Sequence, residues 1–389
     1  RIFFWTLLIL PFYSYFLYPV LLHTLATFSR SWAESDEDGT ELNPDEIEDT
    51  DWPSVAVLIS AHNEERVIAD RVANALEQDY PADKLKVILG SDGSTDATDE
   101  ILRGINDPRF RAFHFSENRG KASVLNDLVA ETTADVLVFS DANTQFRADA
   151  IRWLAVHFAD DRIGCVSGEL ILNDIAKSGN SDALYWRYEK FIKRNESSIG
   201  ALAGANGAIY AIRRELYQKL PVDTVIDDLF ISLDSVRKGF RLHYEPRAQA
   251  EETVAPTIND EARRRIRIGS GNYQAFFRMH WALNPLRGAF FFSYLSHKVL
   301  RWFTPHFLII AFAINLFLIT EPVHFGILVL SLLTVAAGAI GYRRSSRGRP
   351  NPQVINILVF VVVMNISLLF GFYKYMFSDL SGRWERTSR

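Results

Sequence analysis

The sequence predicts an α/β fold with a mostly parallel sheet, joined to transmembrane and interfacial helices. Two observations indicate this. From Ser54 onward, short apolar runs alternate with helical patterns, which is typical of parallel strands linked by crossover helices. In addition, residues 2–29 contain no Asp, Glu, Lys or Arg, and three further apolar runs lie near the carboxyl end. Both features together predict a folded domain attached to a membrane-embedded part.

The first apolar run, residues 2–29, is long enough for a transmembrane helix, which needs about 20 apolar residues. A cleaved signal peptide is the alternative, but the run exceeds the apolar core of a signal peptide and no small-x-small cleavage site follows it. The later runs cover about residues 302–320, 323–342 and 354–372, and buried core helices hardly occur three in succession. We therefore expect an integral protein of the cell (inner) membrane.

An acidic linker, residues 30–53, is expected between the first helix and the domain. Ten acidic residues and no basic one lie between Glu34 and Asp51, so the segment cannot bury enough apolar surface to fold. The expected domain covers residues 54–256, followed by interfacial helices (257–300), membrane helices (301–373) and a tail (374–389). The net charge of −5 does not suggest a nucleic-acid partner.

Short apolar runs predict four strands early in the domain, at residues 55–60, 86–91, 109–115 and 135–140. A helix is expected from about residue 64 to 78, because apolar residues recur there on one helical face. Two later helices are expected at about residues 181–196 and 228–238.

Polar side chains follow three of these strands. Asn63 and Glu64 come after the first, Asp92 ends the second and Asp141 ends the fourth. The carboxyl ends of parallel strands share one edge, where open α/β folds bind ligands. Each residue also has a structural alternative, since Asn63 is a preferred helix cap and Asp92 begins a good turn sequence. Their coincidence at one edge indicates a binding site.

A nucleotide diphosphate near Asp141 implies a bridging divalent cation, because a lone carboxylate would repel the phosphates. Mg²⁺ fits best, since it accepts one or two carboxylates beside phosphate oxygens. Asn143 can add a carbonyl oxygen or hold a metal-bound water. Arg119 and Lys121 flank Gly120 at a helix start, where free amides favour anions, and a solvated basic turn is the alternative.

Two further charged groups have a functional and a structural interpretation. Asp227 and Asp228 precede a helix, where acids are common caps, yet a carboxylate beside a like charge can also be a general base. The arginines of "RRRIR" (263–267) can neutralise a diphosphate or meet anionic lipid headgroups. Their spacing favours the diphosphate for Arg264, Arg265 and Arg267.

Taken in order, these segments resemble the family 2 glycosyltransferases, in particular the membrane-embedded branch of cellulose, hyaluronan and poly-N-acetylglucosamine synthases. The resemblance rests on eight segments: "SAHNEE", "SDGSTD", "NRGKASVLN", "FSDANT", "GANGAIYAIRRELY", "IDDL", "RRRIRIGSGNYQ" and "HKVLRWFTP". It implies a GT-A fold, a nucleoside-diphosphate sugar donor that is usually a UDP-sugar, and Mg²⁺ or Mn²⁺.

The resemblance also implies roles for individual residues. The nucleobase and ribose would be held by Ala61, Asn63, Glu64 and Asp92, with Lys121 beside them. Asp141 and Asn143 occupy the D-x-D metal positions. Asp228 matches the catalytic base and Asp227 stands where Glu is commoner, while the diphosphate-binding helix is matched by Arg264, Arg265 and Arg267. Two positions depart from the family pattern, Asn143 in place of an acid and Ile268 in place of the tryptophan of processive relatives.

The expected function is inverting transfer of a sugar from a UDP-sugar to a saccharide acceptor, in polysaccharide synthesis on the cytosolic face of the membrane. Two alternatives stay open: single-sugar transfer to polyprenyl phosphate or another lipid acceptor, and a catalytically silent scaffold that senses nucleotide. Membrane lipids and export or assembly subunits are the other partners that this function would involve. The basic loop 343–349 is expected in the cytosol. A third span would then export the carboxyl tail, although its basic residues favour the cytosol. Either the last run does not fully cross, or another crossing lies near residues 288–300.

Overall fold

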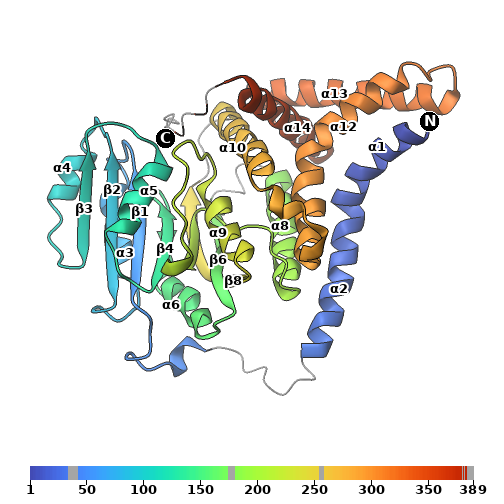
Figure 1. The fold of residues 1–389 in the computed structure, drawn as a ribbon. Helices are drawn as coiled ribbons and strands as arrows, with labels where there is room; N and C mark the ends of the chain where they lie inside the picture. Colours follow the sequence, from blue (N-terminus) through green and yellow to red (C-terminus); the bar gives the residue numbers. More distant parts are fainter. Residues whose placement is uncertain (34–42, 174–179, 254–257, 379, 381, 383–389) are drawn as a thin grey trace.

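The computed structural model describes residues 1–33, 43–173, 180–253, 258–378, 380 and 382. Figure 1 shows a sheet on the left and long helices on the right. The sheet has eight strands in the order β3-β2-β1-β4-β7-β6-β8-β5. The strands are β1 (Val55–Ala61), β2 (Leu85–Asp92), β3 (Phe110–Phe115), β4 (Val136–Asp141), β5 (Gln145–Phe146), β6 (Ile163–Asn173), β7 (Ile209–Arg213) and β8 (Arg241–Thr253).

The first four strands are parallel neighbours, and they confirm the predicted α/β class with a mostly parallel sheet. β7 is antiparallel to both β4 and β6, so β6 and its parallel neighbour β8 run in the same direction as β4. The carboxyl ends of β1, β2, β4 and β8 therefore meet at one edge of the sheet. The sequence did not predict β6 and β8, which are the two longest strands.

Helices cover both faces of the sheet, and β1 shows why. Its Val55, Val57 and Ile59 point into one core, while Ala56 and Leu58 point into the other, as the two-residue period of a strand requires. Helices α3 (Ile68–Leu76), α4 (Thr98–Arg103) and α6 (Ala150–Ala155) pack on the first side. Helices α5 (Lys121–Ala130) and α9 (Asp227–Arg237) pack on the second. All strands of this central region are thus buried on two faces, which explains their apolar runs.

The remaining helices form the region on the right of Figure 1. The N-terminal helix is continuous through α1 (Ile2–Phe12), η1 (Tyr13–Leu17) and α2 (Tyr18–Ala33). The others are α8 (Asn180–Ser198), α10 (Ile258–Arg278), α11 (Ala289–Ser293), η7 (Tyr294–Val299), α12 (Leu300–Asn315), α13 (Pro322–Ser345) and α14 (Gln353–Phe377). Among the described residues, three helices are long and apolar enough to cross a membrane: Ile2–Ser29, Pro322–Ser345 and Gln353–Phe377.

One expected span is not among these three helices. The apolar run at about residues 302–320 forms α12, which ends at Asn315. It continues α11 and η7 without a break, so the helix covers residues 289–315. The first turn of α12 is buried, because Arg301 donates a 2.6 Å hydrogen bond to Glu189 of α8. The expected crossing at residues 302–320 stays a prediction.

The end of the expected acidic linker packs on the domain. Residues 34–42 lie outside the described part of the chain, but Trp52 is only 3% exposed and packs on Tyr80 of the domain. The short helix η2 (Pro44–Glu46) precedes it. The apolar ring of Trp52 thus attaches the end of this acidic segment to the sheet.

Helix α10 joins the domain to the last membrane helix. At the crossing of α10 and α14, a Cβ on Gly371 would lie only 2.7 Å from the backbone carbon of Gly269. Farther along, Arg265 lies over the Phe360 ring at one end and Phe277 stacks on Tyr375 at the other. Much of α14 therefore lies along α10, and the number of crossings in this region stays a prediction.

Candidate active site

Lys121 links two carboxylates at the carboxyl edge of the sheet. Its Nζ lies 2.8 Å from Asp141 Oδ1, at the end of β4, and 3.1 Å from Asp227 Oδ2, at the start of α9. Burial alone would lower the pKa of Lys121, but the negative charges of Asp141 and Asp227 outweigh burial and raise it. The side chains of three separate segments thus converge on one cationic atom.

The Asp141 carboxyl is held ionised by its surroundings. Burial would raise its pKa, yet the pKa is lowered, because the charge and hydrogen bond of Lys121, and then the charges of Arg264 and Arg267, outweigh burial. The carboxylates of Asp141 and Asp227 both face Lys121, and the amide of Asn143 follows two residues after Asp141. Carboxylate and amide oxygens are ligands that Mg²⁺ and Mn²⁺ accept. The residues present therefore fit a divalent cation.

Asp92 organises the loop that carries Lys121. Its side chain is fully buried and its two oxygens accept hydrogen bonds from the backbone N–H groups of Arg119 (2.9 Å) and Gly120 (2.8 Å). Gly120 has a φ of 87°, which favours glycine, and it immediately precedes α5. Asp92 thus satisfies free amides at this helix start. Its nucleotide-binding role stays a prediction.

Asn63 does not cap a helix, contrary to the structural alternative, because α3 begins only at Ile68. Its Oδ1 instead accepts a 2.7 Å hydrogen bond from the backbone N–H of Thr95, in the loop after β2. Its φ of 57° is one that asparagine tolerates better than most residues. Asn63 therefore links the loop after β1 to the loop after β2. Ala61, at the end of β1, and Glu64 lie on either side of it in the chain.

Asp228 lies beside Asp227 in the first turn of α9, and the two differ in their environments. Asp227 pairs with Lys121, whereas Asp228 forms no salt bridge with any other described residue. Burial, and next the charge of Asp227, raise the pKa of Asp228 to about 6. A Cβ on Gly207 would lie 3.1 Å from Asp228 Oδ2, so this loop glycine keeps the carboxyl accessible from its side. Such a carboxyl can accept a proton near neutral pH.

The predicted arginines divide into two groups. Arg264 and Arg267 act electrostatically on Asp141, and Arg267 also donates to the Val225 carbonyl at 3.2 Å. Arg265 lies with its guanidinium 4.9 Å from the centre of the Phe360 ring, on the side of α14. One residue is a rotation of about 100° on a helix, so neighbouring arginines cannot share a face. The expected grouping of all three is thus not what the structure has.

Asn143 has a partner that the sequence did not reveal. Its Nδ2 donates a 2.8 Å hydrogen bond to Oε1 of Glu252, the penultimate residue of β8. Because β8 was not predicted as a strand, Glu252 could not be placed beside Asn143. Reading Arg241–Thr253 as a strand would have supplied this signal.

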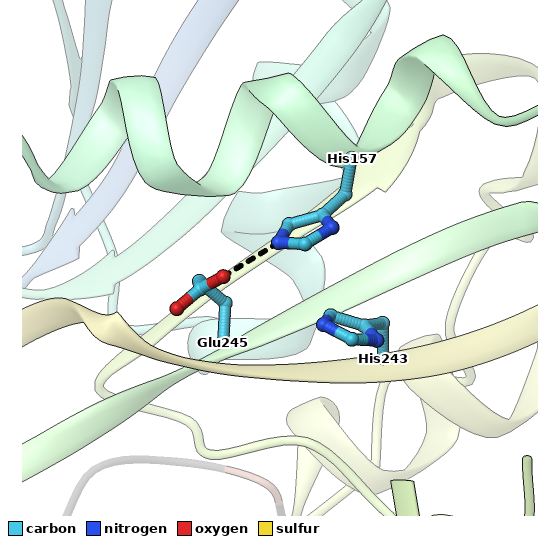
Figure 2. Close-up of side chains that lie close together, drawn as sticks. All are labelled: His157, His243 and Glu245. Atoms are coloured by element: carbon cyan, nitrogen blue, oxygen red, sulfur yellow. Dashed lines mark hydrogen bonds and ion pairs between the residues drawn. The ribbon is translucent and has the colours of Figure 1, made fainter. Parts of the chain in front are cut away.

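A second cluster lies where η3 (Val156–Ala159) packs beside β8. His157, His243 and Glu245 have potential ligand atoms that all lie within 4.8 Å of one another (Figure 2). His157 Nε2 is 2.7 Å from Glu245 Oε2, and Arg247 donates to both Glu245 oxygens at 2.8 and 2.9 Å. Burial, and then His157, lower the pKa of His243 to about 4. The carboxylate is already occupied by Arg247 and His157, so we interpret this cluster as a hydrogen-bonded structural group.

Comparison with known proteins identifies the domain. Residues 56–220 match the family model described as glycosyl transferase family 2. Poly-beta-1,6-N-acetyl-D-glucosamine synthase of Staphylococcus aureus (strain COL) is 27% identical over 245 residues, which are 61% of this chain and 58% of the relative. The synthase of Staphylococcus epidermidis is 25% identical over 234 residues, 58% of this chain and 56% of the relative. The chain thus matches less than two thirds of the length of these curated relatives.

A solved structure has the same fold. The mannosyltransferase PcManGT from Pyrobaculum calidifontis, in complex with GDP-Man and Mn²⁺, superposes with a TM-score of 0.69 and 21% identity. The superposition covers 96% of this chain and 99% of that chain, so it includes the helical region as well as the sheet. Residues 56–220 therefore match the glycosyl transferase family 2 model, and the chain has a GT-A fold with three candidate membrane-spanning helices among the described residues.

Proposed function

We propose that this protein transfers a sugar from a UDP-sugar to a saccharide acceptor, with inversion at the anomeric carbon, in polysaccharide synthesis at the cell membrane. The curated relatives are named as poly-beta-1,6-N-acetyl-D-glucosamine synthases, which supports a saccharide acceptor. The observation that carries the proposal is the pair Asp227 and Asp228, in which one carboxylate is ion-paired and the other has a raised pKa of about 6. This division of environments is what acid–base chemistry at neutral pH needs.

In this proposal Asp228 removes the proton from the acceptor hydroxyl as the hydroxyl oxygen attacks the anomeric carbon. The diphosphate leaves on the opposite face and meets the positive charges of Lys121, Arg264 and Arg267. These charges are fixed before the reaction, so they stabilise the negative charge that develops in the transition state. The bond from the anomeric carbon to the diphosphate oxygen therefore breaks as the bond to the acceptor oxygen forms, and the configuration at this carbon is inverted.

Asp141 and Asn143 would hold a divalent cation, which supplies charge neutralisation to the leaving diphosphate. Ala61, Asn63, Glu64 and Asp92 belong to the first two loops of the same edge, and we assign them to the nucleoside end of the donor. The hydrogen bond between Asn63 and Thr95 supports this assignment indirectly, because it fixes the two loops relative to each other. The proposed orientation has the domain in the cytosol, where nucleotide sugars are made available.

A second candidate is transfer of a single sugar to a lipid phosphate such as polyprenyl phosphate. Lys193 of α8 favours it. The residues at positions 189, 193 and 196 lie on one face of α8, and Glu189 and Glu196 there contact His297 of η7. Burial, and next the charge of Lys298, lower the pKa of Lys193 to about 8, although Asp228 and other acids act in the opposite direction. Lys193, which interacts electrostatically with the proposed base Asp228, suits an anionic acceptor.

The test uses purified full-length protein in detergent. UDP-glucose, UDP-N-acetylglucosamine, UDP-galactose and GDP-mannose are each supplied with Mn²⁺ or Mg²⁺, with an oligosaccharide or a polyprenyl phosphate as acceptor. We expect nucleotide release and a labelled saccharide product with one UDP-sugar, and loss of both when EDTA removes the metal. A labelled lipid phosphate would favour the second candidate. Absence of turnover with every donor, despite donor binding, would favour a nucleotide-sensing scaffold.

A further inference from the structure

We propose that Glu252 is a ligand of the divalent cation and supplies the carboxylate that Asn143 lacks. The inference rests on the proposed function, because it concerns the cation of the same donor site. It starts from a feature of the sequence: the residue two positions after Asp141 is an amide, whereas the family pattern has a second acid there. An amide oxygen is a weaker ligand for a hard cation than a carboxylate.

The strand topology brings Glu252 to the right place. β4 ends at Asp141 and β8 ends at Thr253, and the two strands run in the same direction. The chain turns after β4 and forms β5, which pairs with the end of β8. The 2.8 Å hydrogen bond from Asn143 Nδ2 to Glu252 Oε1 spans this pairing. The bond uses the amide nitrogen of Asn143 and leaves its carbonyl oxygen as the atom that can bind a metal.

Charge compensation distinguishes Glu252 from its neighbour Glu251. Adjacent residues of a strand point to opposite faces, and Glu251 lies 3.5 Å from Arg147. Glu252 is half-buried and forms no salt bridge with any other described residue. A carboxylate that is partly removed from water without a positive partner calls for a cation. Asp141, by contrast, has the ammonium of Lys121 in this structure.

Together these residues form a carboxylate, amide and carboxylate set at one edge of the sheet, made of Asp141, Asn143 and Glu252. It presents oxygen atoms to Mn²⁺ or Mg²⁺ and leaves room in the coordination shell for diphosphate oxygens and water, as these cations require. The second acid of the site is thus moved from the loop after β4 to the end of β8.

The experiment measures Mn²⁺ binding directly. Full-length protein in detergent, with saturating UDP, is titrated with Mn²⁺ while electron paramagnetic resonance reports free Mn²⁺. We expect Glu252→Gln to weaken Mn²⁺ binding at least about tenfold, the lower end of the effect of losing groups that support a metal. The matched control Glu251→Gln should keep the wild-type affinity. The double variant Asn143→Asp with Glu252→Gln should regain affinity, because it returns the carboxylate to position 143.

Two results would overturn the inference. If Glu252→Gln binds Mn²⁺ as tightly as the wild type, Glu252 only orients Asn143. If the double variant binds as weakly as Glu252→Gln, the lost affinity comes from altered folding and not from a moved ligand, and circular dichroism with thermal unfolding of each variant checks this directly. Failure of the wild type to bind Mn²⁺ with UDP would refute the proposed donor site itself, which is a different outcome.

Discussion

Replacing Asp228 with Asn removes the proposed base and changes little else. At a pKa of about 6, some nine tenths of Asp228 is ionised at pH 7, so the wild type keeps nearly its full supply of base. The asparagine is uncharged and similar in size, and it leaves the bonds of Lys121 to Asp141 and Asp227 intact. A positioned general base contributes about 10² to 10⁴ in rate, so kcat should fall by that factor.

The assay separates chemistry from donor binding. Transfer of labelled sugar gives kcat, and calorimetric titration with UDP in the presence of Mn²⁺ gives the donor-site affinity, which should stay near the wild-type value. The matched control is Asp227→Asn, which breaks the 3.1 Å ion pair with Lys121 and should change nucleotide affinity as well as rate. If the turnover of Asp228→Asn stays within about tenfold of the wild type, the loss is smaller than a general base supplies. Asp228 would then have only a structural role in the first turn of α9.

Three further predictions concern pH, the arginines and the membrane contact. Because Asp228 must be ionised to accept a proton, kcat/KM should fall as pH drops through about 6, and Lys121→Met should move this acid limb upward in pH, since the Lys121 charge lowers the pKa of Asp228. Arg267→Ala should weaken UDP binding by about tenfold or more, as expected for one charged hydrogen bond, whereas Arg265→Ala should leave it unchanged. Gly371→Ala should lower thermal stability, because overpacking against the α10 backbone costs about 1–3 kcal/mol.

Each of these has a clear contrary result. A pH profile that Lys121→Met leaves in place would mean that another group controls the acid limb. Equal losses of UDP affinity in the two arginine variants would contradict the separation of their side chains on α10. An unchanged unfolding temperature of Gly371→Ala in detergent would show that α10 and α14 can separate without cost.

The sequence was sufficient for elements whose signals are local. The strands that end at Ala61, Asp92 and Asp141 are short and apolar because both faces are buried, and their polar ends mark the edge of the sheet. β8 carries Arg241, Glu245 and other polar residues, and also Pro246, since it lies farther from the centre of the sheet and its pairing with β6 has register shifts. Its apolar alternation is therefore weak, and Glu252 was missed with it.

Other differences arise from contacts between distant segments. Asn63 resembles a helix cap locally, but its partner is Thr95 in another loop. The residues of "RRRIR" show charge and spacing, but only the position of α14 beside α10 decides that Arg265 turns toward Phe360. The burial of the first turn of α12 follows from packing too, because Arg301 bonds to Glu189 of α8. Tertiary contacts of this kind have no local signal in the chain.

We propose that a metal and a nucleotide bind at the carboxyl edge of the sheet beside Asp141. Crystals of the protein with UDP and Mn²⁺, measured at the manganese absorption edge, would locate both. We expect one strong anomalous peak next to Asp141, with the diphosphate between that peak and Arg264 and Arg267 of α10. A peak at His157, His243 and Glu245 with none at Asp141, or a nucleotide bound away from this edge, would refute this site.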